Sequence, residues 1–293
     1  MDVVEFGPLP EAQQDMWHAM IDLSERLPGR WTLVGGQMVA LHAARRGVEM
    51  GRTTTDVDAL LDVRADSGLF RRIDLVLRRD MGFVSQVGME GTQHRWVRGR
   101  VSVDVLVPAV SRSIAGARTS LGGVAVQSPG ANQALERSEM IEVRTESRAG
   151  VVARPSLLGA IISKASALTI PKDSSRNRHL SDMALLLSMA GAQDDIYNLS
   201  KSDLRYLRKA ATLLGEPDLL QVDRRSAERV RQYIETAVST SGPSGLRAPM
   251  LASPYNSFAP RPNAKPTRGG ICGHATEAGR PCQNPSGSCP HHR

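Results

Sequence analysis

Three aspartates and a glycine pair are the residues of this sequence whose types and spacing could do chemistry. Asp56 and Asp58 form an Asp-x-Asp pattern, and Asp104 interrupts the apolar run VSVDVLVP further along the chain. Alternate side chains of a β-strand point to the same side, so Asp56 and Asp58 can converge on one point. Gly35-Gly36 follows a short apolar run and precedes an expected helix, where backbone N–H groups can approach a phosphate. The pattern therefore indicates a site for a cation and a phosphate group.

Two neighbouring carboxylates repel each other unless a cation lies between them. Mg²⁺ suits oxygen-only ligands and usually completes its shell with substrate phosphates. With Asp104 on a neighbouring strand, the three carboxylates could hold Mg²⁺ for an in-line phosphoryl transfer, and Asp104 could take the proton of the attacking hydroxyl. The alternative is that the glycine pair only caps a helix and that Asp56 and Asp58 form a solvated strand end. An unpaired charge at Asp104 among valines is costly, which favours the functional interpretation.

These segments also carry a family resemblance. LVGGQMVALHAARR, RTTTDVDALLD and VSVDVLVP resemble the nucleotidyltransferase superfamily that includes DNA polymerase beta. More narrowly, they are similar to the AbiEii-type nucleotidyltransferases, the toxin halves of type IV toxin–antitoxin pairs. That branch favours Thr before the Asp-x-Asp pattern and a His or Arg in the helix after the glycine pair, here His42, Arg45 and Arg46. The resemblance is good over residues 30–108 and looser to about residue 190, and it departs at residues 47–51, which look like an inserted loop.

A second group of polar residues lies in the expected helical part. Lys164 falls in the apolar segment LLGAIISKASAL, where a lysine is uncommon unless its charge reaches water or meets an anion. Asp182 follows on the next expected helix. AbiEii-like proteins resemble this part, and the resemblance implies that Lys164 contacts the triphosphate and that Asp182 supports it or the acceptor. The alternative is an interhelical Lys164–Asp182 salt bridge with no ligand.

Other basic residues near these segments are weaker candidates. Lys172, Arg176 and Arg178 fit a solvated basic turn that could touch RNA. His94 and Arg95 lie on an expected strand near Asp104 and could face the nucleotide, but a cross-strand pairing role fits them equally well.

The C-terminal segment holds all three cysteines of the chain and a histidine pair: Cys272, Cys282, Cys289, His291 and His292. Three thiols and one imidazole match a closed structural Zn²⁺ site, with His292 or His291 as the fourth ligand and His274 as a further candidate. An odd number of cysteines in a cytoplasmic chain argues against a disulfide framework. Such a zinc knuckle would fold only with its metal. The alternative is a disordered tail whose cysteines are incidental.

The net charge of +7 is concentrated at the C-terminal end. Residues 241–293 hold six Lys or Arg against one acid, which leaves 31 basic and 29 acidic side chains in the preceding 240 residues. Attraction to nucleic acid is therefore expected mainly from the tail. No stretch approaches the roughly 20 apolar residues of a membrane span, and the acidic N-terminus lacks a signal-peptide pattern. We expect a cytoplasmic protein with no membrane partner.

The elements that must position these residues follow from hydrophobic periodicity. Early helices are expected over residues 10–27, 37–45 and 70–79. Strands are expected over residues 31–34, 55–63, 83–87, 93–97 and 101–107, with edge strands at 124–127 and 140–143. Four later helices are expected at residues 155–168, 179–190, 202–214 and 222–237.

The fold class expected from this order is α+β. A mixed sheet with flanking helices is followed by a helical domain and a short tail, and the resemblance implies that the first part has the polymerase-beta-like nucleotidyltransferase fold. The expected parts are a catalytic domain at 1–150, a helical domain at 151–240, a Pro/Ser/Gly-rich linker at 241–270 and the zinc-knuckle-like segment at 271–293.

Together these features predict a Mg²⁺-dependent nucleotidyltransferase that moves a nucleoside monophosphate from an NTP to an acceptor hydroxyl. The resemblance implies that the acceptor is RNA, with the tRNA 3′ end as the first candidate, and that the role is that of a toxin or phage-defence factor with a neutralising antitoxin as partner. Two alternatives stay open. One is an enzyme that modifies a small molecule, as aminoglycoside nucleotidyltransferases do, and the other is a non-catalytic nucleic-acid-binding protein with the same fold.

Overall fold

The computed structural model describes residues 1–50, 56–64, 66, 68–88, 91–109, 119, 121–171, 173–215 and 222–240. All of them belong to one compact unit, Met1–Tyr255. The expected linker at 241–270 and the Cys/His segment at 271–293 lie outside the described residues, so the zinc site stays a prediction.

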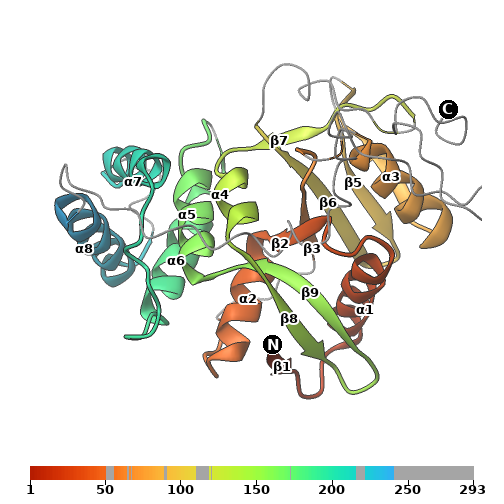
Figure 1. Ribbon diagram of the computed structural model, residues 1–293, viewed down its shortest axis with the longest axis horizontal. Coiled ribbons are helices and arrows are strands. Elements are labelled where there is room, and N and C mark those ends of the chain that lie inside the picture. Colours follow the sequence, from red (N-terminus) through yellow and green to blue (C-terminus); the bar gives the residue numbers. More distant parts are fainter. Residues whose placement is uncertain are drawn as a thin grey trace, which may run out of the picture. The chain divides into compact units, whose positions relative to one another are not determined.

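A mixed sheet forms the centre of this unit (Figure 1). Its strands are β2 (Trp31–Val34), β3 (Asp56–Leu61), β4 (Val84–Val87), β5 (Gln93–Arg98), β6 (Val101–Pro108) and β7 (Val126–Ser128). They lie in the order β2-β3-β6-β5-β4, and β7 pairs with the end of β6. The β3–β6 and β6–β7 pairs are parallel, whereas β2–β3, β5–β6 and β4–β5 are antiparallel. The predicted α+β class with a mixed sheet and flanking helices is confirmed.

One face of this sheet is apolar because alternate residues of each strand point toward it. Val57 of β3 and Val103 and Val105 of β6 share a buried cluster with side chains of α1 (Glu11–Arg26) and α3 (Leu69–Leu75). Phe70 of α3 meets Trp96 of β5 edge to face, with ring centroids 6.2 Å apart. α3 continues into a π-helical turn, Val76–Asp80, so the helix expected over residues 70–79 changes type midway. The polar residues of the same strands are left on the opposite face.

A second, three-stranded sheet joins the N-terminal strand to a hairpin in the middle of the chain. It has the order β1-β8-β9, formed by β1 (Asp2–Glu5), β8 (Ser138–Arg144) and β9 (Ala149–Pro155). β1 and β9 are not among the expected elements. The expected domain boundary between residues 150 and 151 falls inside β9, which pairs with β8 along its whole length. The first expected domain therefore runs into the second through one hairpin.

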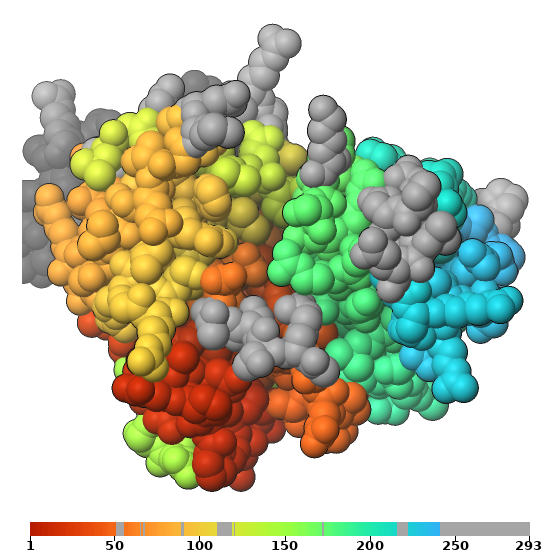
Figure 2. Space-filling view, turned by 180° about the vertical axis from the view of Figure 1, so that it is seen from behind, coloured from red at the N-terminus to blue at the C-terminus, as the bar shows by residue number. Residues whose placement is uncertain are grey.

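One helix, α4 (Ala131–Glu136), directly precedes this hairpin, and four follow it: α5 (Leu157–Ala167), α6 (Arg176–Ser188), α7 (Lys201–Leu213) and α8 (Arg224–Thr240). α5 packs against α2 (Gly35–Arg45), α4, α6 and α7, and it is apolar on most sides because Ile161, Ile162 and Ala165 are all fully buried. α8, drawn in cyan to blue in Figure 2, covers α6 and α7. The four helices expected after residue 155 are confirmed, whereas α4 was not expected. Within the described part of the chain, we find no helix with the length and apolar character needed to cross a bilayer.

Candidate active site

The three predicted carboxylates come together on the polar face of the central sheet. Asp56 and Asp58 alternate with Val57 along β3, so both side chains lie on that face. The parallel register of β3 and β6 pairs Asp58 with Asp104 and Asp56 with Ser102. The expectation that Asp104 lies on a strand neighbouring the Asp-x-Asp pattern is thus confirmed.

Asp104 has a partner that the sequence left open. Arg95 of β5 donates two hydrogen bonds to it, from Nε to Oδ1 at 2.7 Å and from Nη2 to Oδ2 at 2.6 Å. The Asp104 side chain is only 12% exposed, so this bidentate pair is largely screened from water. Of the two roles considered for Arg95, the structure shows the cross-strand pairing. His94 on the same strand has a buried Nδ1 that finds no hydrogen-bond partner among the described residues.

The Asp58 carboxyl lies in an environment that opposes its ionisation. Burial, together with the facing Asp104 carboxylate, raises the pKa of Asp58 from its ordinary value of 3.8 to about 7. Lys164 and Arg95 lower that pKa in part, and Asp56 raises it further. Two like charges that share a buried site push a carboxyl pKa upward, and a bound cation would remove this cost.

Gly35 makes room for Asp58. It begins α2 with a φ of +69°, in the left-handed region where glycine is favoured. A Cβ built on Gly35 would lie 1.7 Å from Oδ2 of Asp58, so no other residue fits without displacing the carboxylate. Val34, which precedes α2, provides no side-chain cap. Gly35 and Gly36 therefore bring a helix N-terminus, with its partial positive charge, next to the carboxylate site.

Lys164 and Asp182 join the two central helices of the C-terminal part. Nζ of Lys164 on α5 lies 2.8 Å from Oδ2 of Asp182 on α6, and both side chains are only 4% exposed. The ion pair is common to both interpretations of these residues, since Asp182 can hold Lys164 in place with or without a ligand. The influence of Lys164 on the Asp58 pKa indicates that the ammonium group lies near the carboxylates.

His179, one turn before Asp182, was not singled out from the sequence. Its Nε2 lies 2.9 Å from Oδ2 of Asp173. Burial and the Lys164 charge lower the pKa of His179, which favours the neutral imidazole. A histidine three residues before a helical aspartate was the signal available in the sequence, because such residues share a helix face.

The basic residues of α2 serve the fold. Nε2 of His42 lies 3.0 Å from the carbonyl oxygen of Pro155, and its ring also contacts Arg154. Arg46 binds Asp194 at 2.7 Å, and Arg45 pairs with Asp2. These contacts tie α2 to the N-terminal strand and to the segment after α6.

The basic residues expected to form a turn lie in part in the first turn of α6, which begins at Arg176. Arg176 donates from Nη2 to the carbonyl oxygen of Ile170 at 3.2 Å, and Arg178 bonds the Ser175 hydroxyl. Lys172 lies outside the described residues.

The site matches Mg²⁺ in the type of its donors and not in their arrangement. In the described part of the chain, no group of three or more His, Cys, Asp or Glu side chains is arranged to hold a metal ion. Arg95 occupies one lone pair on each oxygen of Asp104, and Ser102 donates to Asp56. A carboxylate offers about four lone-pair positions, so these bonds leave acceptor capacity. The oxygen-only donors Asp56, Asp58 and Asp104 suit Mg²⁺.

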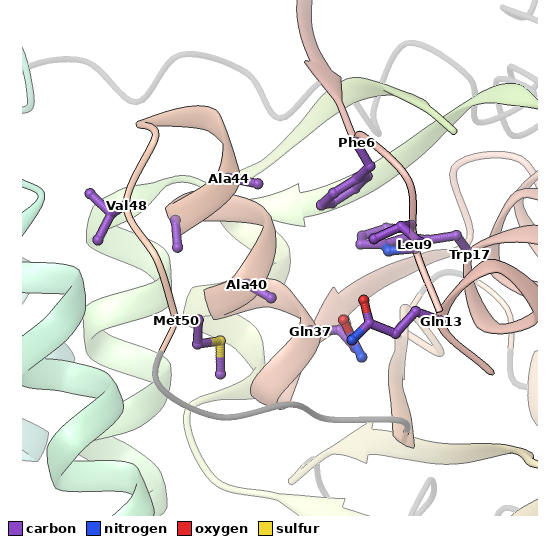
Figure 3. Close-up of a pocket in the computed structure, with 10 residues that line it drawn as sticks. Phe6, Leu9, Gln13, Trp17, Gln37, Ala40, Ala44, Val48 and Met50 are labelled. Atoms are coloured by element: carbon purple, nitrogen blue, oxygen red, sulfur yellow. The ribbon is translucent and has the colours of Figure 1, made fainter. Parts of the chain in front are cut away.

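A separate cavity of about 270 Å³ lies beside α2 (Figure 3). Phe6, Leu9 and Trp17 supply apolar walls, and Gln13 and Gln37 supply amides. None of the predicted catalytic residues on β3, β6, α5 and α6 lines it. We therefore assign the candidate site to the carboxylate face of the sheet.

Comparison with known proteins adds no relative. A scan against models of protein families finds no match to the chain, and a search of curated proteins finds none either. The similarity to the AbiEii-type nucleotidyltransferases thus rests on the motifs of the sequence alone.

Proposed function

We propose that the chain is a Mg²⁺-dependent nucleotidyltransferase of the polymerase-beta-like superfamily, which transfers a nucleoside monophosphate from an NTP to an acceptor hydroxyl. One observation carries the proposal. Asp58 faces Asp104 across two parallel strands, directly beside the helix that begins at Gly35, and its pKa is raised to about 7. A carboxylate that is unfavourable for the folded chain alone is accounted for when a cation and a phosphate complete its surroundings.

The reaction follows from these groups. The acceptor oxygen attacks the α-phosphorus, a new P–O ester bond forms, and the P–O bond to pyrophosphate breaks. Bound Mg²⁺ would neutralise charge that develops on the phosphate oxygens. Asp104 takes the proton of the hydroxyl, and Arg95 holds Asp104 in one orientation through its two hydrogen bonds. The backbone N–H groups of Gly35 and Gly36, at the start of α2, donate hydrogen bonds to phosphate oxygens.

Lys164 holds the triphosphate in this scheme. Its ammonium has three N–H donors, and the pair with Asp182 at 2.8 Å uses one of them. Asp182 is a positioning residue because its ion pair fixes the ammonium, whose charge lowers the pKa of Asp58. The same contact is expected from the resemblance to AbiEii-like proteins.

RNA is the acceptor that we propose, with the tRNA 3′ end first. This choice and the role as a toxin or phage-defence factor, with an antitoxin as partner, come from the resemblance. We further propose a cytoplasmic location and a Zn²⁺ site formed by Cys272, Cys282, Cys289 and His292.

Labelled NTPs, Mg²⁺ and total RNA test the proposal. Wild-type protein is expected to label RNA, and Asp58→Asn to lose this activity by at least about a thousandfold. Asp62→Asn, which removes the carboxylate just after β3 that pairs with Arg64, is the matched control and should keep full activity. Label on a small molecule instead of RNA would support the small-molecule alternative. If wild type and Asp58→Asn give identical results with every NTP and acceptor, the catalytic proposal is wrong.

A double variant tests the role of Lys164. Lys164→Met removes the cationic partner of the buried Asp182 and is expected to cost about 3–5 kcal/mol of folding stability. Lys164→Met/Asp182→Leu removes both charges and should recover most of that loss, since a buried ion pair can be replaced by apolar side chains. Recovery of stability without recovery of NMP transfer would support triphosphate binding by Lys164. Recovery of both would show that the pair is only structural.

A further inference from the structure

A second cavity lies between β7, the segment that follows α5, and α7. Its volume is about 500 Å³. Its walls include Pro129, Ile170, Pro171, Arg205, Tyr206 and Lys209. No catalytic residue proposed above lines this cavity, so it is a separate candidate for binding.

The walls of this cavity combine apolar surface with one fixed aromatic ring. Pro129, Ile170 and Pro171 provide the apolar part. The Tyr206 hydroxyl accepts a hydrogen bond from the backbone N–H of Gly130 at 3.1 Å, which holds the ring at the edge of the cavity. The Arg205 guanidinium lies 5.5 Å from the centre of that ring. A flat ring beside apolar walls and a cation is suited to a nucleobase, because every base can stack on an aromatic ring.

The outward face of α7 is strongly basic. Its exposed cations are Lys201, Arg205, Arg208 and Lys209. The one acid of α7, Asp203, is fully buried and pairs with Arg137 at 2.6 Å, so it does not offset them at the surface. Among the described residues, no ion pair reaches any of the four cations. A cationic helix face at the rim of the cavity is complementary to a phosphate backbone.

Two elements connect this cavity to the candidate active site. α5 carries Lys164, and Thr169 in the cavity wall comes five residues later, which is about 7.5 Å along a helix. β6 carries Asp104, and Val107, three residues further, pairs with Gln127 of the cavity wall, at about 10 Å along a strand. Both separations are short compared with the length of a few nucleotides, so one RNA chain could reach the carboxylates and the cavity.

We propose that this cavity binds a nucleotide of a single-stranded RNA acceptor, upstream of the 3′ end that reacts. Its base stacks on Tyr206 against the proline walls, and its phosphates lie near Arg205 and Lys209. The inference rests on the proposed function only in taking RNA as the acceptor. An acidic protein segment would also be attracted to α7, but its carboxylates do not complement the aromatic ring and the apolar walls of the cavity.

Binding without catalysis tests this site. A fluorescently labelled single-stranded RNA of about a dozen nucleotides is titrated with the full chain, without NTP and with EDTA. Arg205→Ala/Lys209→Ala should weaken binding about tenfold or more and should flatten the slope of log K against log salt by about 1.4, since each phosphate contact contributes about 0.7. Arg225→Ala/Arg231→Ala on α8 removes the same charge from another exposed helix and should change Kd less than about twofold.

Tyrosine variants separate stacking from structure. Tyr206→Phe keeps the ring and loses only the bond to Gly130, so it should bind RNA nearly as tightly as wild type. Tyr206→Leu removes the ring and should weaken binding about tenfold. Thermal unfolding of both variants shows whether each remains folded. If Tyr206→Leu does not fold, Tyr206→Phe still tests the site, because loss of RNA binding by this variant would show that the ring alone does not hold the base.

The outcomes distinguish this inference from the proposed function. If the α7 variants bind RNA as wild type does, or if the α8 control loses as much affinity, the inference is overturned. The same holds if polyglutamate binds at these residues and RNA does not. If the α7 variants lose RNA binding as expected while wild type transfers no nucleotide to any acceptor, the binding site stands and the proposed function fails.

Discussion

Asp58→Asn is predicted to make the folded chain more stable at neutral pH while it abolishes nucleotide transfer. The Asp58 pKa rises from 3.8 to about 7 in the folded chain. This difference of about 3 pH units corresponds to about 4 kcal/mol at 1.36 kcal/mol per unit. Because the residue is only half-buried, water screens part of that cost, and we expect a gain of about 2 kcal/mol for the variant.

The sign of the effect follows from proton linkage. Between pH 3.8 and about 7 the folded chain binds the Asp58 proton more tightly than the unfolded chain does. The stabilisation from the protonated carboxyl is therefore fully present below pH 3.8, and it is lost as the pH rises toward 7. An asparagine cannot ionise, so the Asp58→Asn variant lacks this decline.

Urea unfolding of wild type and variant at about pH 5 and about pH 8, in EDTA, measures the effect. The difference in unfolding free energy between the two proteins isolates Asp58, because the titration of all undisturbed groups is the same in both. We expect the advantage of Asp58→Asn to grow by about 1 kcal/mol from the lower to the higher pH, because about a third of the decline already lies below pH 5. Added Mg²⁺ should then stabilise the wild type and leave the variant unchanged.

One result would refute this reasoning. If Asp58→Asn is less stable than wild type at about pH 8 by as much as or more than at about pH 5, the ionised Asp58 carboxylate is favourable in the fold. Attraction to Lys164 would then outweigh burial and repulsion by Asp104, and the surroundings of Asp58 would no longer favour a bound cation. Asp62→Asn should show no such pH dependence of its stability difference.

Two further predictions concern residues near α2. Gly35→Ala should destabilise the chain by at least about 1–2 kcal/mol more than Gly47→Ala in urea unfolding. Both glycines have positive φ, at +69° and +64°, but only the Cβ at position 35 meets Asp58, so equal losses would contradict the close contact. Burial and the Arg154 charge hold the pKa of His42 well below 6.5, so its contribution to stability is present above pH 6.5 and is lost as the pH falls below that value. His42→Gln should reduce this acid sensitivity by up to about 1.4 kcal/mol per pH unit, and an unchanged pH slope would show that His42 accepts a proton in place.

Periodicity in the sequence is enough to predict most of the elements that hold the site. The apolar runs at β2, β3 and β6 are long enough to be recognised as buried strands, and Asp56, Asp58 and Asp104 stand out within them because charges are rare there. The strong apolar character of α5 likewise isolates Lys164 as the exception. These residues violate the local pattern, which is why they are visible without a structure.

The partner of Asp104 was also within reach of the sequence. Gly99 and Arg100 form a two-residue turn, with a φ of +57° at Gly99, and this pairs Arg98 with Val101. Counting back along the antiparallel strands from that pair places Arg95 opposite Asp104. The hairpin register thus decides between the two roles considered for Arg95.

Other features depend on contacts that no local pattern encodes. β1 is four residues long and pairs with β8, more than 130 positions away, so its short sequence carries no sign of its partner. The basic face of α7 can be recognised only from the structure, because Asp203 is buried in an ion pair with Arg137 of another segment and does not lie on that face. From the sequence, the charges of α7 are interspersed with an acid and resemble an ordinary solvated helix.

The raised Asp58 pKa and the close fit of Gly35 bear on each other. A carboxylate in an unfavourable position could be relieved if its side chain turned toward water, but the helix that starts at Gly35 approaches within contact of its oxygen. A larger residue at position 35 would push Asp58 away. Glycine has no Cβ and so avoids this clash, and it also suits the positive φ at this position. The fold therefore holds the carboxylate beside Asp104 and the α2 N-terminus at a cost to its own stability. Such a cost is expected where a site is organised for a ligand, and a purely structural role of Asp58 does not explain it.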